Sequence, residues 1–263
     1  MDQLLNRLGQ FMPIESVQDV PAATSPTEHR LLDLWSRTAP VMSHGWRRKT
    51  RERVEQCLSG NLQERRNLVH GHTSNPIEYL ELKRITNGAP VVACLVEYAR
   101  ATELPAAVAA DPVMRSLVDT INDARILVND IHSYQREMAS EDEPANMIFV
   151  LRKFLGCDLD QAVAMTSDLA RSRLDQFEHL ADVEVPAMIQ ECGLSPAESA
   201  NVLGYIEDLR DWVPGWQEWF ARTERYPQNP PVMTVHGEPA DIRRLGGHTG
   251  LGTATARRLL LSP

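Results

Sequence analysis

The chain has 263 residues, of which 43% are hydrophobic and 24% are charged, and its formal net charge is −9. These proportions are typical of a soluble globular protein with room for one large domain or two small ones. The acidic balance and the lack of a dense basic run argue against a nucleic-acid-binding protein. Because no apolar segment approaches about 18 residues, we also expect no membrane span.

The cysteines indicate a reducing compartment. They are far apart, form no C-x-x-C pair and have no histidine at zinc spacing, so free thiols are expected. The start of the chain, Met1-Asp2-Gln3, lacks the basic and apolar regions of a signal peptide. These features predict a cytoplasmic protein. The four cysteines are Cys57, Cys94, Cys157 and Cys192.

Helical periodicity and capping signals run through the sequence, and no segment shows the alternation of a strand. Ser25-Pro26-Thr27-Glu28 and Ser195-Pro196-Ala197-Glu198 both place a capping serine, a proline and a glutamate at a helix start. Ser59-Gly60 is interpreted as a helix end and 139–143 as an acidic loop. We predict an all-α domain over residues 1–230 and a flexible tail over 231–263. The expected helices cover residues 1–12, 26–39, 44–58, 76–84, 89–101, 105–110, 112–138, 145–155, 158–179, 185–192 and 196–223.

Three oxygen-bearing side chains recur every four residues in the long helix expected from 112 to 138. They are Asn129, Ser133 and Glu137. A four-residue step along an α-helix moves the side chain by only about 40° around the axis, so all three fall on one stripe. An amide oxygen, a hydroxyl and a carboxylate together form a hard oxygen site, which suits Mg²⁺ with substrate phosphates completing its octahedron.

The alternative is that this stripe is only the solvated face of an amphipathic helix. Its neighbours favour a buried helix instead. Leu127-Val128 precedes the stripe, and Ile131 and Tyr134 lie between its members. We therefore interpret the three residues as a candidate metal site.

The pattern Asn129-Asp130-x-x-Ser133-x-x-x-Glu137 resembles the second metal motif of class I terpene synthases. Other stretches resemble further parts of the bacterial members of that family. Asn75 to Arg84 is similar to the pyrophosphate-sensor segment, Arg225-Tyr226 to the pair that grips the diphosphate, and Gly250 to Thr253 to a tail motif. The stretches 133–137, 154–157 and 172–179 are similar to the germacradienol-forming domain of geosmin synthases.

This resemblance implies a class I terpene synthase helical bundle that uses Mg²⁺ to ionise farnesyl diphosphate and cyclise the carbocation to a germacradienol-type product. It assigns the metal to Asn129, Ser133 and Glu137. It assigns catalysis to Arg225 and Tyr226. The residues implied to bind the diphosphate are Lys83, Arg84, Arg136, Arg225 and Tyr226.

Two departures from the family pattern lead to further expectations. The sensor arginine aligns with Lys83, and Arg84 follows it, so either residue could face the substrate. The family's first, aspartate-rich metal motif has no counterpart before Asn129. We therefore expect a chain that begins partway through the domain and lacks the first helices. Its cavity would be open, with apolar residues around Leu127 and Val150 exposed.

A bundle without its aspartate-rich motif would ionise the substrate slowly or not at all. The alternative function is therefore a catalytically inactive, truncated homologue that at most binds diphosphate or a partner chain. The sequence leaves the oligomeric state open, with a homodimer as one possible assembly.

Overall fold

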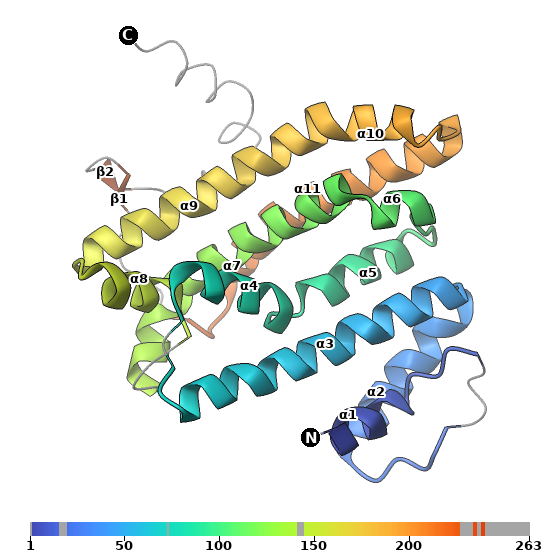
Figure 1. Cartoon of the computed structure of the whole chain (residues 1–263), viewed down its shortest axis with the longest axis horizontal. Coiled ribbons are helices and arrows are strands. Elements are labelled where there is room, and N and C mark those ends of the chain that lie inside the picture. Colours follow the sequence, from blue (N-terminus) through green and yellow to red (C-terminus); the bar gives the residue numbers. More distant parts are fainter. Residues whose placement is uncertain are drawn as a thin grey trace. The chain divides into compact units, whose positions relative to one another are not determined.

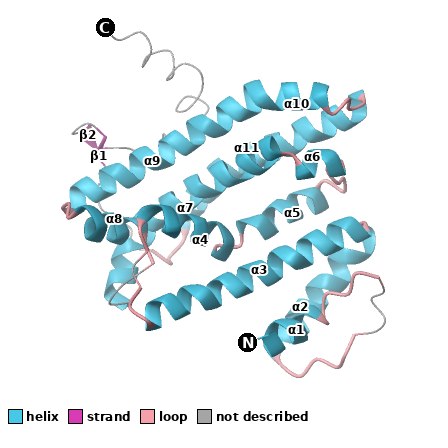
Figure 2. Cartoon of the chain, in the orientation of Figure 1, coloured by secondary structure: helices cyan, strands magenta, loops and turns pink. Residues whose placement is uncertain are grey.

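The computed structural model of the chain describes residues 2–15, 20–72, 74–140 and 145–226, together with Thr234–Val235 and Glu238–Pro239. Its helices are drawn in Figure 2. The chain divides into two compact units: Met1–Gly71 with Ile85–Leu104, and His72–Arg84 with Pro105–Pro263. Most of the described residues are helical, which confirms the all-α prediction.

The described residues of the first unit form four α-helices and one turn of 3₁₀ helix (Figure 1). They are α1 (Asp2–Gly9), α2 (Pro26–Thr38), η1 (Ala39–Val41), α3 (His44–Val69) and α5 (Ala89–Ala99). Its core is built around two tryptophans, Trp35 and Trp46, whose ring centroids are 6.2 Å apart. Each indole nitrogen donates to a backbone carbonyl, that of Trp35 to Pro13 at 3.0 Å and that of Trp46 to Cys94 at 2.9 Å.

The second unit contains the remaining described elements. They are α4 (Pro76–Thr86, which ends in the first unit), α6 (Ala106–Ala110), α7 (Pro112–Ser140), α8 (Met147–Leu155), α9 (Leu159–His179), the π-helical turn η2 (Leu180–Glu184), α10 (Val185–Glu191), α11 (Pro196–Arg222), β1 (Thr234–Val235) and β2 (Glu238–Pro239). The long helix α7 packs against α8, α9 and α11, and Figure 1 shows α9 running alongside it.

Both predicted capping boxes are present. The Ser25 hydroxyl accepts from the Glu28 amide at 3.3 Å, and the Glu28 carboxylate accepts from the Ser25 amide at 3.1 Å. Ser195 and Glu198 repeat this arrangement at 3.3 Å and 2.9 Å. Two otherwise unpaired donors are satisfied at each helix start, which is why these sequences begin helices.

Helix α3 contradicts the helix end predicted at Ser59-Gly60, because it continues to Val69. The reason is a close approach between segments of the first unit. A Cβ added to Gly60 would lie 3.0 Å from the Cγ2 atoms of both Ile85 and Thr86. The neighbouring Asn61 amide also donates to the Thr86 carbonyl at 3.1 Å. Glycine at position 60 therefore makes room for packing and does not end the helix.

Alanine at position 60 should consequently destabilise the fold even though alanine favours helix by about 1 kcal/mol. Crowding of a packed contact typically costs about 1–3 kcal/mol, so we expect Gly60→Ala to lower the free energy of unfolding by about 1 kcal/mol. Gly215→Ala in α11 is the control, since a Cβ there meets no atom within 4 Å. It should raise stability in urea denaturation. Equal stabilisation by both substitutions would contradict the packing role of Gly60.

Other parts of the predicted layout also differ from the structure. Residues 139 and 140 were expected in an acidic loop but belong to α7, which runs to Ser140, and residues 141–144 lie outside the described part. Helices α9 and α10 are joined through η2. In the predicted tail only β1 and β2 are described, and they pair antiparallel. The rest of 231–263, including the motif from Gly250 to Thr253, lies outside the described residues.

The prediction that apolar residues around Leu127 and Val150 would be exposed is wrong. Leu127 is 0% exposed and Val150 4% exposed. Helix α9 packs against both α7 and α8 within the same unit. All four cysteines are free thiols, as predicted. Among the described helices, none is both long and apolar enough to cross a bilayer.

Candidate metal and diphosphate site

Two of the predicted metal ligands, Ser133 and Glu137, face a common side chain. This is Asn146, the residue immediately before α8, which is 0% exposed. Its amide nitrogen donates to the Glu137 carboxylate at 3.0 Å and lies 3.4 Å from the Ser133 hydroxyl oxygen. The stripe on α7 is therefore directed toward the start of α8, and its Ser133 is fully buried.

The third predicted ligand, Asn129, has a different partner. Its amide nitrogen donates to the Tyr226 hydroxyl at 2.9 Å, across 97 positions of sequence. An amide that donates through its nitrogen keeps its oxygen available as an acceptor or metal ligand. Tyr226 is buried just after α11, so the end of that helix reaches the stripe on α7.

Three of the predicted diphosphate residues come together at Tyr226. The guanidinium carbon of Arg136 lies 5.4 Å from the centroid of the Tyr226 ring, and that of Arg225 lies 5.8 Å from it. Arg136 also pairs with the Glu137 carboxylate at 3.5 Å. Two guanidinium groups and one phenol are thus gathered beside Asn129.

The two alternatives for the sensor position contact different partners. Arg84 donates two hydrogen bonds of 2.7 Å to the carboxylate of Asp123, which is 0% exposed. These bonds raise the pKa of Arg84 above its ordinary value. The Lys83 ammonium instead lies 5.8 Å from the ring centroid of Tyr79. The guanidinium of Arg84 is therefore paired with a buried carboxylate, whereas Lys83 is directed toward another group of side chains.

That group centres on Asp130, which sequence reasoning did not single out. One of its carboxylate oxygens accepts from the Tyr79 hydroxyl at 2.6 Å and from the Met147 amide at 2.8 Å. Burial raises the pKa of Asp130 to about 7, although the positive charge of Lys83 and the hydrogen bonds oppose the rise. Asp130 thereby links α4, α7 and the first turn of α8. Nothing local in the sequence indicates these long-range partners.

His132 and Arg125 are two further residues that sequence reasoning missed. The His132 ring stacks on Phe220 with centroids 4.7 Å apart, and burial lowers its pKa to about 4, so it is neutral near pH 7. Arg125 lies one helical turn before Asn129, where side chains four residues apart are neighbours. Burial lowers the pKa of Arg125, and the charges of Asp130 and Tyr226 oppose that change. Helical periodicity could have found Arg125.

The oxygen set on α7 fits a hard divalent cation in its chemistry. It offers an amide oxygen, a hydroxyl and a carboxylate, and its members are held by Asn146 and Tyr226. Outer partners of this kind are typical of metal ligands. In the described residues there is no group of three or more His, Cys, Asp or Glu side chains that could hold a metal by itself. A Mg²⁺ ion held by these oxygens would keep several waters and could accept phosphate oxygens as further ligands.

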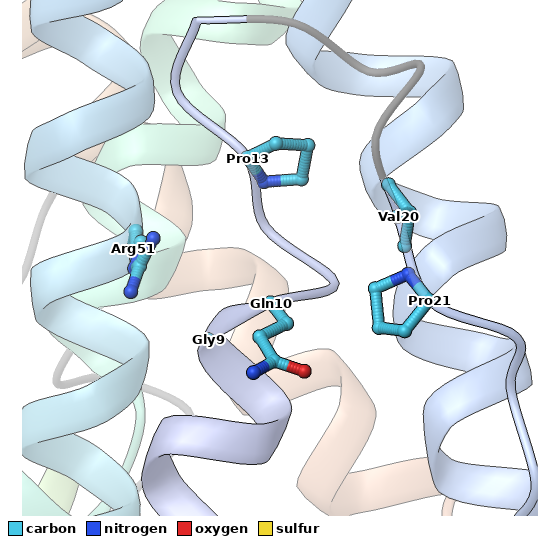
Figure 3. A pocket seen from close by; sticks show the side chains of 6 residues that line it. All are labelled: Gly9, Gln10, Pro13, Val20, Pro21 and Arg51. Carbon is cyan, nitrogen blue, oxygen red and sulfur yellow. The ribbon is translucent and has the colours of Figure 1, made fainter.

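A separate open hollow of about 670 Å³ lies in the first unit (Figure 3). None of the predicted site residues lines it. Its lining consists of Gly9, Gln10, Pro13, Val20, Pro21 and Arg51.

Residues 1–176 match the family model described as terpene synthase family 2, C-terminal metal binding. The chain belongs to this family. Membership confirms the family resemblance found in the sequence. The description of the family names metal binding.

Relatives of this terpene synthase family member include sesquiterpene synthases. Sesquiterpene synthase 1 of Postia placenta is 29% identical over 194 residues, which are 74% of this chain and 55% of that protein. The chain thus spans about half the length of this curated relative. Among solved structures, an a-eudesmol synthase has a TM-score of 0.75 at 26% identity. The match covers 84% of this chain and 70% of the a-eudesmol synthase chain. The germacradien-4-ol synthase of Streptomyces citricolor has a TM-score of 0.72 at 25% identity, with coverages of 84% and 68%.

Proposed function

We propose that the chain binds farnesyl diphosphate at the stripe of α7 and ionises it with the help of Mg²⁺, which starts a germacradienol-type cyclisation. One observation carries the proposal: Arg136 and Arg225 both lie on the Tyr226 ring, whose hydroxyl accepts from the predicted metal ligand Asn129. Two guanidinium groups and the amide proposed to bind the metal thus lie around the same tyrosine. A diphosphate needs both kinds of group.

The charged side chains around Tyr226 and Asp130 favour binding of a polyanion. Arg136 and Arg225 contact Tyr226, the charge of Lys83 acts on the Asp130 carboxyl, and the charge of Asp130 acts on Arg125. Guanidinium groups bind phosphate oxygens through paired hydrogen bonds, and these bonds strengthen as negative charge develops on a leaving group.

Asn129, Ser133 and Glu137 are the residues that would hold the metal. When bound, Mg²⁺ neutralises diphosphate charge and orients the leaving group. The chain's own cations act in the same direction. As the allylic carbon–oxygen bond breaks, both bonding electrons leave with the diphosphate. Arg136 and Arg225 are placed to stabilise the charge that accumulates there, while the Tyr226 hydroxyl keeps its own proton available for donation.

The carbocation left behind needs an apolar, water-free environment. The N-terminal half of α7 also carries Ile121 and Leu117, which are both 0% exposed. Close to Asn129, Phe220 stacks on His132 and lies 5.7 Å from the Tyr226 ring. Aromatic faces attract cations. Because His132 is neutral near pH 7, it adds no repulsive charge.

The finer assignment of product type rests on similarity. The sequence stretches at 133–137, 154–157 and 172–179 are similar to germacradienol-forming domains. A germacradien-4-ol synthase is also among the related structures. The names of the curated relatives support a substrate of sesquiterpene size.

The alternative is binding without cyclisation. It is favoured by the single carboxylate of the ligand set and by the pairing of Arg84 with Asp123, which engages that guanidinium with a buried carboxylate. One ion leaves much of the charge on a diphosphate, which slows ionisation.

Incubation of the 263-residue chain with farnesyl diphosphate, with and without Mg²⁺, separates these functions. Release of pyrophosphate and the organic products are measured, the latter by gas chromatography. We expect slow, Mg²⁺-dependent release accompanied by a germacradienol-type alcohol. Mg²⁺-dependent binding of inorganic pyrophosphate without any turnover would establish the alternative. Absence of both binding and turnover would refute each of them.

A further inference from the structure

Asn146 uses both ends of its side-chain amide. Its oxygen accepts from the Ile148 amide at 3.0 Å and so caps α8. Its nitrogen donates to the Asp130 carbonyl at 2.8 Å and to the Glu137 carboxylate at 3.0 Å, and it lies 3.4 Å from the Ser133 hydroxyl oxygen. The capping role requires only the oxygen, so the nitrogen contacts call for a separate explanation.

The backbone around Asn146 is held in place by its neighbours. The Ala145 carbonyl accepts from the Tyr79 hydroxyl at 3.1 Å, and the Met147 amide donates to the Asp130 carboxylate at 2.8 Å. The first contact is partly buried, the second is buried, and Asn146 itself is 0% exposed. Asn146 is therefore a rigid donor rather than a mobile surface amide.

We propose that Asn146 is a positioning residue for the metal site, which holds the Glu137 carboxylate and the Ser133 hydroxyl in place for the ion. This inference rests on the proposed function. A glutamate side chain loses considerable rotamer freedom when it is fixed. The hydrogen bond from Asn146 fixes one oxygen, Oε2, in advance, and the other, Oε1, lies 3.5 Å from Arg136. Loss of such an outer partner typically weakens metal binding by about 10–100-fold.

Helix capping alone would predict something different. Serine, threonine and aspartate cap helices about as well as asparagine, because each supplies an oxygen. Only asparagine adds an amide donor. The chain contains a matched site for comparison, since the Asn75 side-chain oxygen caps α4 by accepting from the Ile77 and Glu78 amides, each at 3.0 Å.

The test compares Asn146→Ser with Asn75→Ser. Both substitutions keep a capping oxygen and change no charge, but only the first removes the donor that faces Glu137 and Ser133. Binding of inorganic pyrophosphate is measured by calorimetry with and without Mg²⁺, and thermal unfolding reports stability separately. We expect Asn146→Ser to weaken Mg²⁺-dependent binding about tenfold and Mg²⁺-free binding less than about twofold. Asn75→Ser should change neither, because Asn75 is assigned neither to the metal nor to the diphosphate; only Lys83 and Arg84 of its segment are.

Two outcomes would overturn the inference while leaving the proposed function in place. The first is wild-type affinity in Asn146→Ser, which would reduce Asn146 to a helix cap. The second is an equal loss with and without Mg²⁺, which would indicate general disruption. If the serine variant does not fold, Asn146→Thr, which keeps the cap and more side-chain volume, decides by the same criteria. A wild-type chain that binds no pyrophosphate with Mg²⁺ would refute the proposed function, and this inference with it.

Discussion

Replacing Arg84 with methionine should lower the free energy of unfolding by about 3 kcal/mol or more, because it leaves a buried charge without its main partner. Asp123 is 0% exposed, and Arg84 supplies two hydrogen bonds of 2.7 Å to it. The remaining cation, Arg173, lies 3.5 Å from the same carboxylate. One longer contact cannot replace two short, charge-assisted hydrogen bonds. Urea denaturation followed by circular dichroism measures the loss.

Two further variants separate this effect from the loss of the arginine side chain itself. Arg173→Met should cost clearly less than Arg84→Met, because the paired hydrogen bonds remain. The double substitution of Arg84→Met with Asp123→Leu should recover part of the stability, because it removes the buried charge together with its partner. If Arg84→Met stays within about 1 kcal/mol of the wild type, or if the double variant recovers nothing, the ion pair does not have the expected role.

Glu137→Gln should weaken Mg²⁺-dependent pyrophosphate binding at least tenfold, which corresponds to about 1.4 kcal/mol or more. The substitution removes the only carboxylate of the proposed ligand set. It keeps an oxygen to which Asn146 can donate, so the fold should be little affected. Calorimetric titration with inorganic pyrophosphate in excess Mg²⁺ measures the change.

Without Mg²⁺, Glu137→Gln should instead strengthen pyrophosphate binding. Glu137 pairs with Arg136 at 3.5 Å, and its neutral replacement leaves that guanidinium more available to the anion. The control is Asp168→Asn on α9, where a carboxylate with 56% side-chain exposure lies 3.6 Å from Arg171. This control should bind like the wild type. Equal affinities for the wild type and Glu137→Gln in Mg²⁺ would exclude Glu137 as a metal ligand.

Features that depend on neighbouring residues in the chain could be predicted from the sequence. The capping boxes at Ser25 and Ser195 were predicted correctly because a cap and its partner lie three residues apart. The common stripe of Asn129, Ser133 and Glu137 follows from helical periodicity alone. The placement of Arg225-Tyr226 beside this stripe came from the family resemblance, since no local rule connects positions so far apart.

Features that depend on tertiary contacts could not be predicted in this way. The local pattern at Gly60 predicts a helix end. The residues that pack against Gly60, Ile85 and Thr86, are distant in sequence, so the pattern cannot reveal its packing role. Asn146 is recognisable as a helix cap, but its donation to Glu137 is not. Lys83 and Arg84 are about 100° apart around a helix, so they must face different ways. Only the position of Asp123 in the fold shows that Arg84, and not Lys83, forms the ion pair.

The shifted pKa values of Asp130 and His132, both on α7, have a joint consequence for proton uptake on folding. The pKa of Asp130 rises from 3.8 to about 7, so between these values the folded chain holds one proton more than the unfolded chain. Asp130 alone would therefore make stability fall as the pH rises. The pKa of His132 falls from 6.5 to about 4, so there the folded chain holds one proton fewer, and stability would rise with pH. Between about pH 4 and pH 6.5 the two effects oppose each other, and this buried stretch of α7 folds with almost no net exchange of protons.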